Sequence, residues 1–221
     1  FSANAMFDYP DLTVLPHAYG QPHSRGRLRA TPEDFQVREE LDFAPDGTGE
    51  HVWLWVRKRG ANTEWVARQL ARQASVPMSA VSYAGLKDRH AVTEQWFSVH
   101  LPGKADPDWS TDPDSDFAVL ETARHSRKLR RGALRGNAFR IVVRELDGDP
   151  AELAARFERI AATGVPNYFG EQRFGREGGN LERAAAMFEG REKVCDRQQR
   201  GLYLSAARSA LFNAVLARRV V

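Results

Sequence analysis

The residues best suited to chemistry lie in one short charged loop, residues 83–93, with the sequence YAGLKDRHAVT. Its single carboxylate, Asp88, stands between two cations, Lys87 and Arg89, and His90 follows. Nearby positive charge favours the ionised form of an acid, so we expect Asp88 to be available as a nucleophile or as an electrostatic stabiliser. The alternative is a surface loop whose charges simply face water.

Two apolar runs on either side of this loop predict the strands that must position it, residues 81–84 (VSYA) and 96–99 (WFSV). Gly85 would let the backbone turn where the first of these strands ends. A stronger strand is predicted over residues 51–59, because apolar side chains occupy both of its faces. That pattern is typical of a strand at the centre of a sheet.

The remaining elements are predicted from the same two periodicities. Further strands are expected at residues 27–30, 35–41, 117–122 and 141–143. Helices are expected from a cap at Asn62 or Thr63 to Pro77, and at residues 150–162, 181–188 and 206–220. The sequence therefore predicts an α+β protein with a mixed, largely antiparallel sheet flanked by helices.

Composition limits the class of protein. The chain has 221 residues, of which 42% are hydrophobic and 28% charged, as in ordinary globular proteins. The single Cys195 excludes an internal disulfide framework and a cysteine-based zinc site. No apolar run approaches the roughly 18–20 residues needed to span a bilayer, and no signal peptide is visible, so we expect a cytoplasmic location. Residues Phe1 to Ala5 are interpreted as a tag remnant before Met6.

Charge is unevenly distributed, although the net charge is only +3. Residues 124–144 contain eight Lys or Arg and no acid, whereas residues 106–116 contain five Asp and no Lys or Arg. A basic run of this kind suggests a polyanion partner. Asn137 and Phe139 would point the same way on a strand, where they could bond a base edge and stack on a base. The alternative is a solvated basic loop with Phe139 in the core.

Several cofactor-dependent chemistries lack the residues they need. The charged loop contains no second acid for a paired-carboxylate hydrolase, and His90 and His100 do not have zinc-ligand spacing. The acidic segment has Phe117 where a calcium loop requires glycine. The glycine-rich residues 164–176 do not form a phosphate-binding loop, because Arg and Glu follow Gly175. That segment is either an ordered connection or a second RNA-facing surface. We expect no metal and no cofactor.

Residues 83–96 closely resemble the signature of TruD-type tRNA pseudouridine synthases. Four more stretches match the same family in the same order, namely residues 31–35, 135–139, 165–170 and 204–213. Several long matches in order are far more specific than one short motif. The resemblance covers nearly the whole chain from Met6.

This resemblance implies isomerisation of uridine to pseudouridine at position 13 in the D arm of tRNA, with Asp88 as the catalytic nucleophile. Phe35, Asn137 and Phe139 match positions that hold the target nucleotide, and Arg29 matches a basic residue that would keep Asp88 ionised. The cations expected to contact tRNA are Lys87, Arg89, Arg127, Lys128, Arg130, Arg131 and Arg135. The alternative is a non-catalytic tRNA-binding or tRNA-folding protein.

The resemblance also implies a domain organisation. Family members are substantially longer, and residues far downstream complete their catalytic sheet. We therefore expect residues 6–163 to form the N-terminal part of the catalytic domain and residues 164–221 to begin an inserted α/β domain. We also expect a monomer, and we expect the 221-residue chain to be incomplete and inactive by itself.

Overall fold

The computed structural model describes residues 15–220, so the interpreted tag remnant, Phe1 to Ala5, lies outside the described residues. The chain divides into two compact units. One, the sheet unit, comprises Arg25–Asp147 and contains every strand of the described chain. The other, the helical unit, comprises residues 15–24 and the residues from Gly148 onward.

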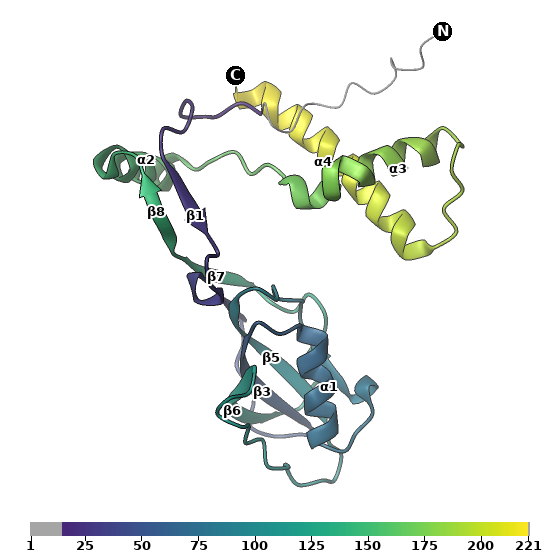
Figure 1. Ribbon diagram of the computed structural model, residues 1–221. Helices are drawn as coiled ribbons and strands as arrows, with labels where there is room; N and C mark the ends of the chain where they lie inside the picture. The colour runs from purple at the N-terminus through teal and green to yellow at the C-terminus, as the bar shows by residue number, and fades with distance from the viewer. Residues whose placement is uncertain (1–14, 221) are drawn as a thin grey trace. The chain divides into compact units, whose positions relative to one another are not determined.

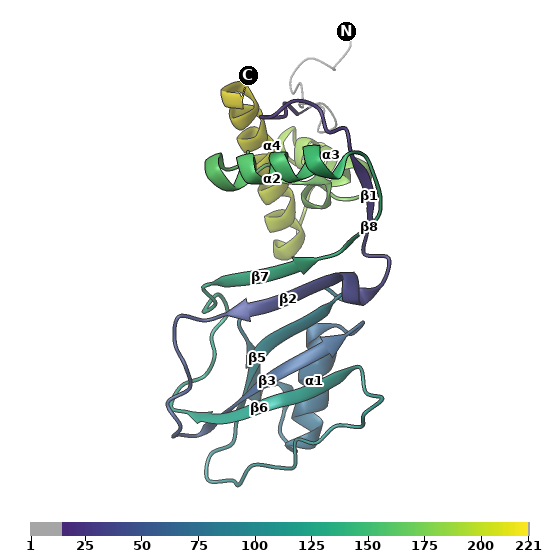
Figure 2. The same cartoon turned by 90° about the vertical axis from the view of Figure 1, so that its left-hand side faces the viewer.

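The sheet unit is organised by a six-stranded sheet (Figure 2). Five of its strands lie in the order β6 (Phe117–His125), β3 (His51–Arg59), β5 (Val92–His100), β2 (Phe35–Glu40) and β7 (Gly136–Ile141), and β4 (Val81–Tyr83) also pairs with β5. Among the described strands only β2 and β5 run parallel. The predicted mixed, largely antiparallel α+β fold is therefore confirmed, with β3 in the interior of the sheet as its two apolar faces indicate.

The core of this unit lies between the sheet and α1 (Thr63–Gln73), which covers one sheet face (Figure 1). Leu54 and Val56 point to this face from β3 and are fully buried, as is Leu70 of the helix. The opposite face buries Trp53. Burying a large apolar side chain stabilises the fold by about 1.5–3 kcal/mol, so apolar burial on both faces fixes β3 as the centre of the unit.

A separate two-stranded pair, β1 (Arg25–Leu28) with β8 (Val143–Asp147), completes the sheet unit. Arg144 of β8 makes a two-pronged ion pair with the buried carboxylate of Asp34, with N–O distances of 2.7–2.9 Å. The Arg144 guanidinium lowers the pKa of Asp34. The strand predicted to continue past Leu28 ends there, because Arg29 adopts a left-handed conformation with φ 55°.

The helical unit contains α2 (Pro150–Thr163), α3 (Gly179–Phe188) and α4 (Arg197–Val220). The Asp149 side chain caps α2 by accepting a hydrogen bond from a backbone N–H of the first turn. A small core joins α3 to α4 and includes Phe174, Leu181, Ala206 and Ala210. Within residues 15–220, no helix combines the length and apolarity that crossing a bilayer requires.

Candidate active site

The loop that carries Asp88 connects β4 to β5, and buried side chains hold its backbone at three points. Gln95 of β5 donates to the carbonyl of Gly85 over 2.9 Å, and the Thr63 hydroxyl at the start of α1 accepts the N–H of Lys87 over 3.0 Å. Lys58 of β3 donates its ammonium to the carbonyl of Asp88 over 2.6 Å. The loop is therefore fixed by residues from two strands and a helix, although it is charged and lies at the edge of the fold.

A buried ion pair adds a fourth attachment. The ammonium of Lys87 lies 2.7 Å from the carboxylate of Glu39, and both side chains are almost completely buried. Glu39 also accepts the backbone N–H of Trp96 over 3.2 Å. Trp96 lies between the part of β5 that pairs with β2 and the part that pairs with β4, so Glu39 satisfies an N–H that neither strand can reach. Lys87 is thus engaged inside the protein, unlike the tRNA-facing cation expected from the sequence.

The carboxylate of Asp88 itself is accessible, with its side chain 42% exposed. Its charged neighbour is Arg29, whose guanidinium nitrogen lies 3.8 Å from a carboxylate oxygen. Arg29 follows β1 in the strained conformation described above. Strain of this kind costs about 1–3 kcal/mol and persists only where the surroundings enforce it. The distance of 3.8 Å shows that Arg29 pairs with Asp88, as the sequence leads us to expect.

Two aromatic rings lie next to this ion pair, one in contact with Arg29 and the other in contact with the first ring. The Arg29 guanidinium lies over the Phe35 ring, 3.8 Å from its centroid. The ring of Phe139 is tilted against Phe35 at a centroid distance of 5.9 Å and is 57% exposed. The alternative in which Phe139 belongs to the core is therefore wrong. A chain of contacts runs from Asp88 through Arg29 and Phe35 to an open aromatic face.

Asn137 lies two residues before Phe139 on β7, so the two side chains share a sheet face. In the register of β7 with β2, Asn137 is opposite Glu39 and Phe139 is opposite Val37. Asn137 is exposed, whereas its partner Glu39 is buried. The structure therefore places Asn137 beside Phe139 on one face of β7, the strand at one end of the six-stranded sheet.

The predicted RNA-contacting cations are mostly displayed at the surface of the sheet unit, between β6 and β7. Arg127, Lys128, Arg130, Arg131 and Arg135 are all exposed. Arg135 shares an exposed ion pair with Asp42 at 3.5 Å, and Arg89, in the loop that carries Asp88, donates to a backbone carbonyl at 3.2 Å. The segment lines two hollows of about 510 and 390 Å³.

In the helical unit, the glycine-rich segment is held by α4. The buried side-chain amide of Asn213 accepts the N–H of Phe169 and donates to the carbonyl of the same residue, both over 2.9 Å. These bonds join two of the stretches singled out in the sequence, residues 165–170 and 204–213. The Arg173 guanidinium lies 5.1 Å from the centroid of the Phe169 ring beside a hollow of about 430 Å³.

Lys58 and Glu39, which bind the carbonyl of Asp88 and the ammonium of Lys87, were not predicted from the sequence. A signal for both is present in the sequence. Lys58 continues the alternation that buries Val56, and Glu39 continues the alternation that buries Val37. A charge in the next inward position of an apolar strand face indicates a buried partner, because an unpaired buried charge is very costly.

Several known proteins with similar sequences come from one family. The family model "tRNA pseudouridine synthase D (TruD)" matches residues 12–188. The tRNA pseudouridine synthase D of Methylococcus capsulatus is 56% identical over 213 residues, covering 96% of this chain and 60% of that protein. That of Azotobacter vinelandii is 56% identical over 205 residues, covering 93% and 58%. The chain thus spans about 60% of the length of these curated relatives.

A solved structure is also similar. The crystal structure of a proposed tRNA pseudouridine synthase D (TruD) from Methanosarcina mazei matches with a TM-score of 0.66 and 31% identity. The match covers 81% of this chain and 42% of that one.

Proposed function

The chain belongs to the TruD family of tRNA pseudouridine synthases, and we propose that it acts in the isomerisation of uridine to pseudouridine in tRNA. The observation that carries this proposal is the line of contacts from Asp88 through Arg29 and Phe35 to Phe139. It combines an accessible carboxylate, a cation that stabilises its charge and an exposed ring on which a base can stack.

The reaction suits these groups and needs no cofactor. The bond from the ribose anomeric carbon to N1 of uracil breaks, the base rotates, and a bond to C5 forms in its place. The C5 hydrogen is lost as a proton and N1 gains one, so the change is redox-neutral. The target base must first leave its stack, and Phe139 would then stack on it while Asn137 positions the nucleotide. Asp88 would attack the anomeric carbon or the uracil ring, or assist formation of a glycal.

We further propose that the target is position 13 in the D arm. Support for this comes from the resemblance of residues 83–96 to the family signature. The proposal is tested by mapping pseudouridine in tRNA after reaction with the protein. Modification at another uridine of the same tRNA would contradict the D-arm assignment and leave the reaction itself intact.

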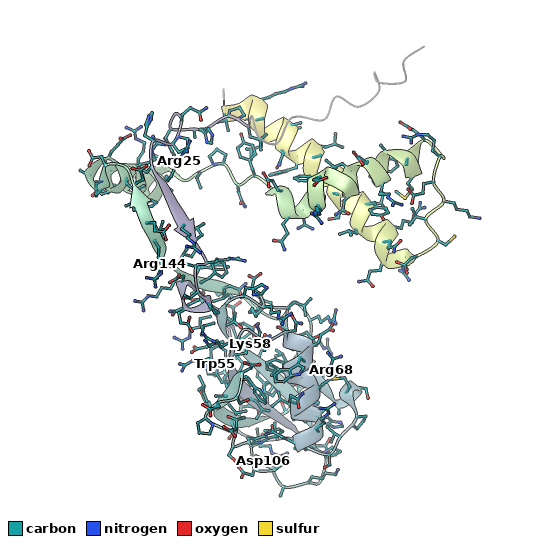
Figure 3. All side chains as sticks on the ribbon, viewed as in Figure 1. Arg25, Trp55, Lys58, Arg68, Asp106 and Arg144 are labelled. Atoms are coloured by element: carbon teal, nitrogen blue, oxygen red, sulfur yellow. The ribbon has the colours of Figure 1, made fainter. Side chains whose placement is uncertain are left out.

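Binding of tRNA should depend on the exposed cations between β6 and β7. Each cation that neutralises a phosphate contributes about 0.7–0.9 to the slope of log affinity against log salt. We expect Arg130→Ala and Arg131→Ala each to reduce that slope by about this amount, measured by fluorescence anisotropy from 50 to 200 mM salt. Arg68→Ala is the control, since Arg68 is exposed on α1 outside the basic run (Figure 3). An equal effect of all three variants would contradict the assignment.

Release of tritium from tRNA labelled at uridine C5 tests the reaction directly, because that hydrogen leaves only when the base is reattached through carbon. The assay should use the 221-residue chain and, in parallel, a form extended to the length of the curated relatives. We expect release by the longer form. Release by the shorter form as well would show that the chain needs no further residues. Salt-sensitive tRNA binding without release by either form would favour the non-catalytic binding protein.

A further inference from the structure

Lys58 is a buried cation with no part in the reaction as described above. It is the next-to-last residue of β3, its relative exposure is 1%, and its ammonium donates to the backbone carbonyl of Asp88 over 2.6 Å. Figure 3 labels it in the sheet unit, toward the end remote from Asp106. It therefore reaches Asp88 through the main chain, whereas Arg29 pairs with the Asp88 side chain.

The surroundings of Lys58 offer few other charges. At its level the neighbouring strands present Thr93 of β5 and Phe117 of β6, neither of which titrates in the physiological range. The hydroxyl of Thr93 is buried and makes no hydrogen bond within the described residues. The charged groups that act on Lys58 are Asp88, which attracts it, and Lys87, which repels it and is itself neutralised by Glu39.

Holding a charge in this position is costly. Burial lowers the pKa of Lys58 to about 8, against the opposing attraction of Asp88. An apolar chain of similar length would fill the same space without that cost. A charged donor has an advantage there, because its hydrogen bond to a carbonyl is about twice as strong as a neutral one and its charge attracts the Asp88 carboxylate.

We propose that Lys58 is a positioning residue that fixes the Asp88 carbonyl and thereby presents the Asp88 carboxylate to Arg29 and the target nucleotide. This inference rests on the proposed function. It assigns Lys58 a role through Asp88, with no contact to the nucleotide. The role requires the charged form, so turnover should decline as Lys58 loses its proton.

The test compares Lys58→Met with Arg57→Met in the form of the protein used for the tritium-release assay. Arg57 is the preceding residue, its side chain is 54% exposed, and it pairs with Glu94 at the surface. We expect Lys58→Met to lower kcat for tritium release by roughly 10- to 100-fold, with KM for tRNA little changed. Arg57→Met should leave both constants near those of the unsubstituted protein. Undiminished kcat in Lys58→Met would overturn the proposal.

The pH profile separates positioning from a purely structural role. In the unsubstituted protein kcat should fall as pH rises through about 8. Lys58→Met should lack this alkaline limb, because it has no proton to lose there, and Lys58→Arg should move the limb to higher pH. A limb near pH 8 that persists in Lys58→Met would belong to another group and would overturn the charge requirement.

A second readout does not depend on turnover, so failure of the proposed function and failure of this inference can be told apart. Hydrogen exchange of the backbone amides in residues 84–91 should be faster in Lys58→Met than in Arg57→Met, whether or not either protein isomerises uridine. Equal exchange in the two variants would overturn the proposal even if the unsubstituted enzyme is active. If Lys58→Arg does not fold, the two methionine variants carry the test.

Discussion

Replacing Asp88 with asparagine should abolish tritium release while leaving tRNA binding essentially intact. The amide has the shape of the carboxylate but cannot act as a nucleophile or hold a negative charge. We expect turnover to fall by roughly 10⁴-fold or more. The protein should stay folded, because the Asp88 side chain is 42% exposed and its pairing with Arg29 at 3.8 Å is solvent-screened.

Binding should not weaken, since the substitution removes an anion from the surface proposed to bind a polyanion. Asp42→Asn is the matched control: Asp42 is an exposed carboxylate of the same unit, paired with Arg135 at 3.5 Å. Turnover measured under single-turnover conditions and binding measured by anisotropy distinguish the two steps. If Asp88→Asn lost binding and turnover to the same extent, or kept its turnover, the catalytic role would be excluded.

How far the sequence predicts this fold depends on what each strand buries. β3 could be placed because apolar residues fill both of its faces, and this alone indicates an interior strand. β5 was predicted only over residues 96–99, yet it begins at Val92. Its first half contains Thr93 and Gln95, polar residues that read as loop but are fully buried. Gln95 is satisfied by Thr63, 32 positions earlier, and by Gly85, ten positions earlier in the loop that precedes β5.

The candidate site also has a part that the sequence predicts and a part that only the fold shows. The charged loop singled out Asp88 and the family resemblance added Arg29, and the structure brings the two side chains to 3.8 Å. The resemblance could not give the conformation of Arg29, because only the fold shows that a non-glycine residue is held at φ 55°. Lys87 stands among the cations expected to contact tRNA, because it flanks Asp88 in the charged loop. Its burial depends on Glu39, 48 positions earlier, and no local pattern encodes such a pairing.

The pair of Glu39 and Lys87 should be the most strongly coupled interaction in the sheet unit. Both side chains are almost fully buried, so removal of one partner leaves the other as an unpaired charge out of reach of water. We expect Glu39→Gln and Lys87→Met each to lower the free energy of unfolding by roughly 3–5 kcal/mol. These losses are measured by unfolding the protein in urea and following the unfolding transition of the sheet unit by tryptophan fluorescence.

The double variant, Glu39→Gln with Lys87→Met, decides whether stability depends on the pair or on each residue separately. Because it leaves no unpaired charge, its loss should be smaller than the sum of the two single losses by about 2 kcal/mol or more. The exposed pair of Arg27 and Glu145, at 3.3 Å, is the control and should show a coupling below about 1 kcal/mol. Additive losses in the buried pair would mean that Glu39 acts only as the acceptor for the Trp96 N–H. A coupled pair would instead show that the loop carrying Asp88 is held in place by a charge buried in the sheet.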